Sequence, residues 1–349
     1  MVKQERNRRS NRPFFPRERG IITSAYTGLV PKNSVISTYY FYLLHTLDIT
    51  KFIYNLGGGV RQSSDYNEIK KLKLPFPPKA EQTAIANYLD TQTEKINLFI
   101  SKKQKLIELL REKKQSIIDD LITKGIEKKV KFKTSGIDWI GDIPMHWVLR
   151  RLGVLGRFSK GGNISRSELI NSNDGVPAIL YGDLYTKYNI VAKDIINRIS
   201  KETSLNSVEL KKGDLLFTSS GETKEDIGKC IFFDSDMHTY VGGDVIIFTP
   251  KKVDGHYISY SQNSSMSKYQ KAISSKGEII VHTYGSKLKN VIMPYPPTIQ
   301  EQRQIVNYIK TETGKIDIAI NRIEKEIELI KEYKQSLIAE VVTGKIKIM

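Results

Sequence analysis

The sequence predicts an α+β protein in which mixed α/β domains are joined to two long antiparallel coiled-coil helices. Three observations lead to this prediction. A long module occurs twice, each copy carries apolar residues at heptad spacing, and the segments between the helices hold short β-branched or aromatic runs bounded by turn residues. Heptad spacing is typical of paired helices, and short bounded runs are typical of strands. At 349 residues the chain is long enough for two domains and their connections.

The repeated module begins at a proline-aromatic run and continues through a long charged segment. The stretch from Pro75 to Ser116 returns from Pro294 to Ser336, and after a one-residue slip behind the prolines the offset is constant. Nearly half of the positions from Glu81 to Thr123 are identical to their partners. A period this long indicates a duplicated module and not a solenoid repeat, so we expect approximate two-fold symmetry.

The repeated segments predict two helices that pair with each other. In each copy, apolar residues recur in alternating steps of four and three, which forms an a/d seam. The seam positions are Ile96, Ile100, Ile107, Leu110, Lys114 and Ile117 in the first copy, and Ile316, Ile320, Ile323, Ile327, Ile330, Lys334 and Leu337 in the second. Lys114 and Lys334 are repeat equivalents, and a polar residue in a seam can fix its register. Packing of each helix on a globular core is the alternative.

The helix length gives a possible spacing between the segments that precede each helix. From Glu94 to Ile122 is about 30 residues, or roughly 45 Å at 1.5 Å per residue. If the helices are antiparallel, the two mixed segments lie at opposite ends, separated by somewhat more than the roughly 34–36 Å of one B-DNA turn. This geometry favours a protein that reads DNA at two places.

Aromatic-proline runs precede both helices, at Pro75–Pro78 and Pro294–Pro297. Proline lacks an amide donor and restricts the residue before it, so we expect stiff connectors that set the angle of each helix. Glu81 and Glu301 then fall in the first helical turn, where the helix dipole favours acidic residues.

The segment before the second helix shows the clearer strand pattern. Its predicted strands are Val176–Tyr181, Asp214–Thr218, Lys229–Phe233 and Val245–Thr249, and its predicted short helices are His256–Ser264 and Met266–Ser275. The first segment matches only the end of this pattern, in Gly20–Lys32, Ser37–Leu56 and Gly58–Lys73. The predicted domains are a partial first head at 1–78, a first helix at 79–126, a linker at 127–135, a complete second head at 136–297 and a second helix at 298–349.

Composition narrows the class of partner. The formal charge of +17 favours a polyanion, although lysine-rich helices in an ordinary soluble protein are the simpler alternative. A membrane surface is less favoured because the basic residues are spread along the chain. Cys230 is the only cysteine, which excludes an intrachain disulfide and fits a reducing cytoplasm. Met1–Arg19 is basic but no apolar stretch follows it, so it does not resemble a signal peptide.

Several enzyme motifs are absent from the sequence. Gly221 and the Gly228-Lys229-Cys230 run do not have Walker A spacing, and no Gly-x-Ser-x-Gly or His-Glu-x-x-His is present. One catalytic alternative remains open, because Asp214, Glu222 and Lys224 have the order of a metal-dependent nuclease core. A polar loop after a strand explains the same residues, and no other metal site is predicted.

Short polar segments of the heads are the candidate DNA contacts. Hydroxyl, amide and cationic groups at strand ends can bond base edges, and glycine allows close backbone approach. The candidates in the second head are Lys160, Gly161, Arg166, Tyr181, Asp183, Ser219, Ser220, Gly221, Lys276, His282 and Lys287, and those in the first are Arg61 and Gln62. Any one of them alone is better explained as solvated surface.

Two motifs resemble those of type I restriction-modification specificity subunits. One is Pro-aromatic-Pro-Pro followed by Glu-Gln and Ile-x-Asn-Tyr, which occurs twice. The other is the run from Ser135 to Trp147, which resembles the family's opening for a target-recognition domain. The run from Gly213 to Phe217, with the Ser-Gly loop after it, is similar to a further family element.

The resemblance implies a non-catalytic subunit. In this family each target-recognition domain reads one half of a split double-stranded DNA site, and two antiparallel helices set the spacing. Modification subunits dock on the helices and bring S-adenosylmethionine and adenine methylation. Restriction subunits bring ATP-driven translocation and cleavage with Mg²⁺. This chain is therefore expected to bind no cofactor and no membrane, and to act in the cytoplasm.

The sequence departs from the family in its first head. A second Trp-x-Gly-x-Ile-Pro-x-His-Trp opening is expected before the first helix, but Trp139 and Trp147 are the only tryptophans. We therefore expect an incomplete first head. A truncated or internally initiated product, an inactive form and a recombination donor all stay open. So does a coiled-coil assembly protein with no DNA role.

Overall fold

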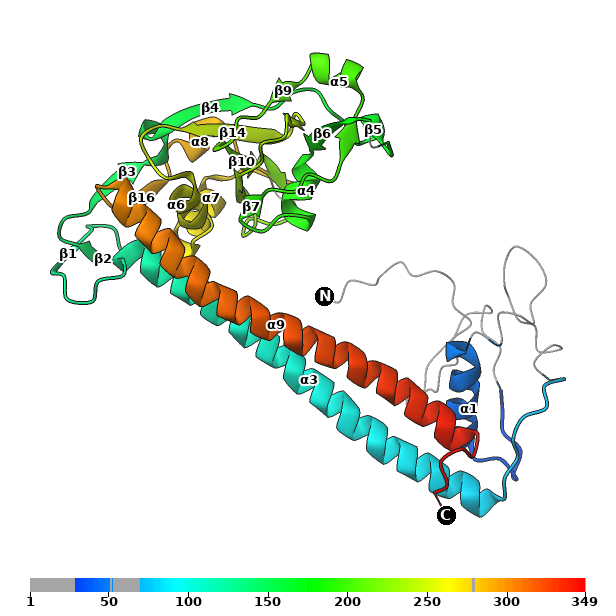
Figure 1. Cartoon of the computed structure of the whole chain (residues 1–349). Coiled ribbons are helices and arrows are strands. Elements are labelled where there is room, and N and C mark those ends of the chain that lie inside the picture. Colours follow the sequence, from blue (N-terminus) through cyan, green and yellow to red (C-terminus); the bar gives the residue numbers. More distant parts are fainter. Residues whose placement is uncertain (1–28, 51, 53–69, 173, 278–279, 349) are drawn as a thin grey trace. The chain divides into compact units, whose positions relative to one another are not determined.

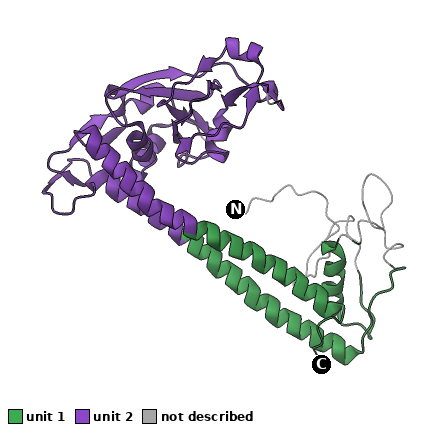
Figure 2. Ribbon diagram, viewed as in Figure 1, with its two compact units in different colours: residues 1–108, 319–349 green, residues 109–318 purple. Residues whose placement is uncertain are grey.

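The computed structural model describes residues 29–50, 52, 70–172, 174–277 and 280–348, which divide between two compact units (Figure 2). Unit 1 comprises residues 1–108 and 319–349, and unit 2 comprises residues 109–318. The predicted contacts Arg61 and Gln62 lie outside the described residues, as do Met1–Arg19 and most of the repeat match in the first head.

Two long helices run through both units and confirm the predicted fold class. Helix α3 spans Lys79–Lys124 and helix α9 spans Ile299–Val342, so both begin earlier than the heptad pattern alone indicated (Figure 1). Glu81 and Glu301 lie in their first turns, as predicted. Every predicted seam position is buried or half-buried, whereas most of the neighbouring positions are exposed.

Polar contacts join the two helices within each unit. In unit 2 the Lys114 ammonium lies 2.6 and 2.7 Å from the two carboxylate oxygens of Asp317. In unit 1 the repeat-equivalent Lys334 donates to Asn97 Oδ1 at 2.8 Å. In the same unit Lys103 also pairs with Glu326 at 2.8 Å, so a later residue of α3 meets an earlier residue of α9, as in an antiparallel pair. Asp317 and Asn97 are repeat equivalents, so the partner of the seam lysine is a carboxylate in unit 2 and an amide in unit 1. Burial without a carboxylate partner lowers the pKa of Lys334.

Unit 2 contains two five-stranded sheets. The first has the order β4 (Gly156–Lys160), β14 (Val245–Pro250), β10 (Leu215–Thr218), β12 (Cys230–Phe233) and β7 (Val191–Ala192). The second has the order β5 (Leu169–Ile170), β8 (Arg198–Ile199), β6 (Val176–Ile179), β13 (Tyr240–Val241) and β9 (Val208–Glu209). In the first sheet β7 is parallel to β12 and the other pairs are antiparallel.

Three short ladders and several short helices complete unit 2. The ladders pair β1 (Phe132–Thr134) with β2 (Asp142–Pro144), β3 (Val148–Arg151) with β16 (Ile292–Tyr295), and β11 (Ser220–Gly221) with β15 (Val281–His282). The helices are η2 (Leu152–Val154), η3 (Arg166–Glu168), α4 (Tyr181–Thr186), α5 (Lys201–Leu205), α6 (Gly255–Gln262), α7 (Ser265–Ser274) and α8 (Gly285–Leu288). The four predicted strands and two predicted short helices are confirmed, except that the first strand ends at Ile179 and Tyr181 begins α4.

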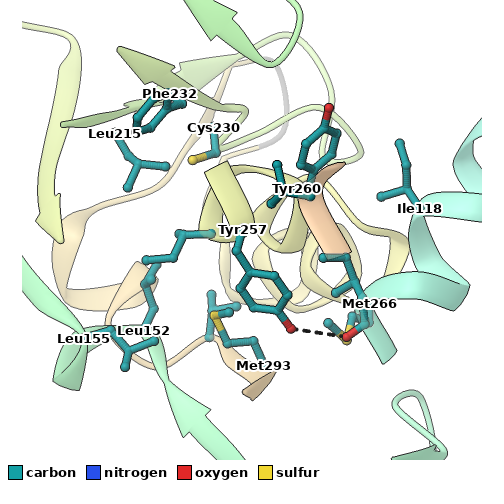
Figure 3. Close-up of a cluster of buried hydrophobic side chains, with 14 of the residues drawn as sticks. Ile118, Leu152, Leu155, Leu215, Cys230, Phe232, Tyr257, Tyr260, Met266 and Met293 are labelled. Carbon is teal, nitrogen blue, oxygen red and sulfur yellow. Dashed lines mark hydrogen bonds between the residues drawn. The ribbon is translucent and has the colours of Figure 1, made fainter. Parts of the chain in front are cut away.

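Strands β10, β12 and β14 of the first sheet are buried on both faces over most of their length, which explains why they read as unbroken apolar runs. Leu215 and Phe217 of β10 face a core shared with α3, α6, α7 and α9, whereas Leu216 between them faces a second core with Leu184 of α4. Tyr257 of α6 lies at the centre of the first core, next to Met293 (Figure 3). Its hydroxyl lies 3.0 Å from the Pro294 carbonyl oxygen and 3.4 Å from that of Ile122.

A fully buried glutamine ties the start of each long helix to the helix of the preceding segment. In unit 2 the Gln302 amide donates to the Pro296 carbonyl at 2.9 Å, and its Oε1 accepts from the Asp254 amide, which caps α6, at 2.8 Å. Gln82, its repeat equivalent, makes the same two kinds of bond in unit 1. There it accepts from the amide of Ile36, which precedes helix α1 (Ser37–Ile49).

A tyrosine contact follows the same symmetry. Tyr39 of α1 donates to the Val342 carbonyl near the end of α9 at 3.2 Å. Tyr257 of α6 approaches the Ile122 carbonyl near the end of α3, and Ile122 is the repeat equivalent of Val342. Each unit therefore contains the same arrangement: a short helix packed against the start of one long helix and the end of the other.

We predict that Gln302→Leu lowers the unfolding free energy of unit 2 by on the order of 3 kcal/mol, because two buried backbone groups lose their partners. Urea unfolding followed by tryptophan fluorescence measures this, since Trp139 and Trp147 both lie in unit 2. Gln304→Leu, at an exposed position of the same helix, is the control and should change stability by less than about 0.5 kcal/mol. Equal effects of the two substitutions would contradict the prediction.

Candidate nucleic-acid interface

One end of the first five-stranded sheet gathers predicted contacts from distant parts of the sequence. Strand β10 ends at Thr218, so Ser219 leaves the sheet where β14 begins at Val245. On the other side of β14, Lys160 pairs with Ile246, and the Gly161 amide donates to the Val245 carbonyl at 2.9 Å. The register thus brings Lys160, Gly161 and Ser219 to the same end of the sheet.

The β11–β15 ladder adds the residues around His282 to this end. Ser220 pairs with His282, and their side chains approach to 3.0 Å between Oγ and Nδ1. Lys276 forms a further backbone bridge with His282, and its side chain is exposed. The Thr283 amide donates to the Ser219 carbonyl at 2.9 Å. Serine hydroxyls and an imidazole are therefore placed together, and the backbone of an exposed lysine lies beside them.

Tyr185 of α4 holds the serine loop in place. Its hydroxyl lies 2.8 Å from Thr218 Oγ1, 3.0 Å from the Ser220 carbonyl and 3.2 Å from that of Asp226. Burial raises the pKa of Tyr185, so the phenol stays a neutral hydrogen-bond donor. A Cβ atom at Gly221 would lie 2.9 Å from this hydroxyl, which explains the glycine. Tyr185 could not be recognised from the sequence, because its partners come from strand ends far along the chain.

The Ser219 hydroxyl donates to the Asp244 carbonyl at 2.7 Å. Two further predicted contacts also have structural roles inside the head. The buried Asp183 carboxylate accepts from the Leu180 amide at 2.8 Å and from the Asn197 side chain at 2.7 Å. At Gly161 a Cβ atom would lie 2.0 Å from the Gly242 carbonyl oxygen, so close packing already requires glycine. Both positions shape the interface, and a direct DNA contact at either stays a prediction.

The remaining predicted residues leave their side chains at the surface. Tyr181 and Arg166 are exposed, and Lys287 of α8 is half-exposed. Tyr284, which the sequence reasoning missed, is exposed directly after Thr283. In residues 136–297 acidic side chains nearly balance the basic ones, so the large positive charge of the chain is not a property of this head. The candidate contacts are therefore a local arrangement of groups and not part of a broadly basic surface.

The structure does not support the nuclease alternative. Asp214 is buried, and its two carboxylate oxygens accept from the Lys211 amide at 2.8 Å and the Thr249 hydroxyl at 2.6 Å. Asp214 precedes β10, whereas Glu222 follows β11 beyond its other end. Within the described residues, no three His, Cys, Asp or Glu side chains are grouped to hold a metal ion. The described part of the chain also has no helix long and apolar enough to cross a membrane.

A buried lysine bonds the backbone of the loop that follows Gly221. Lys271 of α7 is 1% exposed, and its ammonium donates to the carbonyls of Gly228 at 2.5 Å and Gln262 at 2.8 Å. Gly228 ends the loop that follows Gly221, and the next amide, of Lys229, donates to Thr218 Oγ1. Burial lowers the pKa of Lys271 to about 7.

We predict that Lys271 makes unit 2 more stable as the pH rises from about 7 toward 10. Its pKa is about 7 when folded, against an ordinary value of 10.5, so in this window the unfolded chain holds a proton that the folded chain has released. The unfolding free energy should rise by up to about 1.4 kcal/mol per pH unit. Urea unfolding of the wild type and Lys271→Met measures the difference, which isolates this group. An identical slope in both proteins would refute it.

Comparisons with known proteins agree on one family. The family model for the type I restriction modification DNA specificity domain matches residues 14–109 and 144–329. The chain is 27% identical over 325 residues to the putative type I restriction enzyme MjaX specificity subunit of Methanocaldococcus jannaschii, covering 91% of this chain and 70% of that protein. It is 21% identical over 286 residues to the EcoKI specificity subunit of Escherichia coli K12, covering 79% and 58%.

A solved structure shows the same fold. It concerns the complex assembly and conformational transition of the type I R-M system, and one of its chains is similar to this one with a TM-score of 0.65 at 16% identity. The similarity covers 87% of this chain and 70% of that one. At this level of identity the comparison supports the fold and carries no residue roles.

Proposed function

The chain belongs to the type I restriction-modification DNA specificity family, and from this premise we propose that it reads DNA sequence and catalyses no reaction itself. The observation that carries the proposal is the convergence at one end of the first sheet. Lys160, Ser219, Ser220, Lys276 and His282 come from three separate segments of the sequence and meet there. A set of hydrogen-bond donors and acceptors at one end of the sheet suits contact with base edges in a groove.

The chemistry of the set divides between reading and positioning. The Ser220 hydroxyl and the His282 imidazole can each donate or accept, so they suit base edges. The Lys276 ammonium is a mobile point charge and suits a phosphate, which fixes orientation without selecting a base. The Tyr185 bonds keep the serine loop ordered before DNA arrives, which reduces the entropy lost on binding.

We propose that modification subunits bind to the paired helices. Because the seam positions are buried between α3 and α9, they hold the pair together, and the proposed partners contact outer faces instead. In this proposal S-adenosylmethionine belongs to the modification subunits, ATP and Mg²⁺ belong to the restriction subunits, and this chain binds none of them. The complex would act in the cytoplasm, where its DNA target is found.

Substitutions at the sheet end test DNA reading. In complex with the modification subunit, we expect Ser220→Ala to weaken binding to the target sequence by about tenfold while non-specific binding changes little. Lys276→Ala should weaken both and reduce the slope of log affinity against log salt by about one. Fluorescence anisotropy with target and scrambled duplexes at several salt concentrations measures both effects.

Lys212→Ala is the matched control for these substitutions. Lys212 is an exposed lysine just before β10, at the opposite end of that strand, where it pairs with Asp236 at 2.9 Å. Its loss should leave the discrimination between target and scrambled duplexes unchanged. If Ser220→Ala and Lys276→Ala both behave like Lys212→Ala, the sheet end does not read DNA.

A further inference from the structure

Helix α7 of unit 2 buries several polar residues and exposes two large apolar ones, although its Met266 lies in the first core. Its buried residues include Ser267, Gln270 and Lys271, whereas Tyr269 is 51% exposed and Ile273 is 63% exposed. A surface helix normally buries its apolar side and exposes its charged side. Tyr269 and Ile273 are four residues apart, so they lie on the same outward face.

Specific bonds hold α7 in this orientation. The Gln270 side chain donates to the Ile292 carbonyl and accepts from the Ile292 amide, both at 2.8 Å, and thereby pairs with β16. Lys271 bonds two carbonyls below the helix. At the first turn, Asp119 of α3 accepts from the Ser265 amide at 2.8 Å and from its hydroxyl at 2.6 Å. Rotating the helix to bury Tyr269 would break all of these bonds.

A tryptophan from another segment extends the outward apolar surface. Trp139, in the loop between β1 and β2, is 48% exposed, and its ring centroid lies 5.7 Å from that of Tyr269 with the planes at 53°. The two aromatic side chains thus contact each other and are partly exposed to solvent, as is Ile273 on the same face of α7. We call Trp139, Tyr269 and Ile273 the α7 patch.

We propose that the α7 patch is a docking surface for a protein, the modification subunit of the complex. Protein interfaces are enriched in tryptophan and tyrosine at their centres, where these residues contribute much of the binding energy. DNA contacts, in contrast, are dominated by cations and hydrogen-bond donors directed at phosphates, and the three side chains of the patch carry no charge. The patch therefore fits a protein better than a nucleic acid.

The position of α7 indicates which protein. Its first residue is bonded to Asp119 of the long helix α3, and its last, Ser274, lies two residues before Lys276 of the proposed DNA interface. A subunit seated on α7 would contact the surface between that helix and the bases being read. A methyltransferase that acts within the recognised sequence has to be held there. This inference rests on the proposed function.

The affinity of purified chain for purified modification subunit, measured by calorimetry, tests the docking surface. We expect Trp139→Ala and the double variant Tyr269→Ser with Ile273→Ser each to weaken binding at least tenfold. Leu205→Ser is the matched control, since Leu205 of α5 is an apolar residue of the same unit that is 84% exposed. It should leave the affinity unchanged. Melting temperatures should stay near that of the wild type, because all the altered side chains are exposed.

The outcomes separate this inference from the proposed function. If the wild type binds the modification subunit and the patch variants bind equally well, the α7 patch is not the docking surface, although the proposed function stands. If the variants instead lose affinity for duplex DNA and keep the partner, the patch belongs to the DNA interface and the inference is overturned. If the wild type does not bind the modification subunit, the part of the proposed function that places this subunit on the chain fails, and the inference fails with it.

Discussion

A buried glutamine at the start of each long helix determines how that helix leaves the segment before it. Gln302 has no exposed surface, and its amide must be satisfied by Pro296 and Asp254, which fixes α6 against α9. The packing of α6 and α7 in the first core follows from this junction. Gln82 repeats the arrangement with Pro77 and Ile36. Because a buried polar group without its partner costs more than the bond itself contributes, the junction strongly favours one geometry.

The helices and strands that have local sequence patterns could be predicted. The contacts between segments far apart in the sequence could not. The heptad positions marked the buried faces of α3 and α9 because helix periodicity is local. Strands β10 and β12 were found because both faces are apolar. The sheet end depends on register between segments far apart, so Tyr185 was missed and the buried roles of Asp183 and Gly161 were not foreseen. The orientation of α7 depends on long-range bonds from Gln270 and Asp119.

The two copies of the module share a framework and differ in its detail. Lys114 faces a carboxylate in unit 2, and its equivalent Lys334 faces the amide of Asn97 in unit 1. In unit 2 the end of the first sheet presents the proposed interface, and the neighbouring helix α7 presents the α7 patch. Holding a partner next to the sequence being read is a geometric task, which suits a rigid, doubly buried sheet more than a flexible loop. The small charge excess in residues 136–297, with 20 basic against 17 acidic side chains, agrees with recognition by placement.

The most direct test of whether unit 2 reads sequence is to move its head and follow the DNA motif. Adenine methylation would be mapped across the genome in cells that express this chain with its modification subunit. A second strain would carry a chimera in which residues 144–297 are replaced by the corresponding head of a relative. We predict that one part of the methylated motif changes to the sequence read by the donor, while the spacing between its parts stays the same. An unchanged motif in the chimera would contradict the assignment of sequence reading to this head.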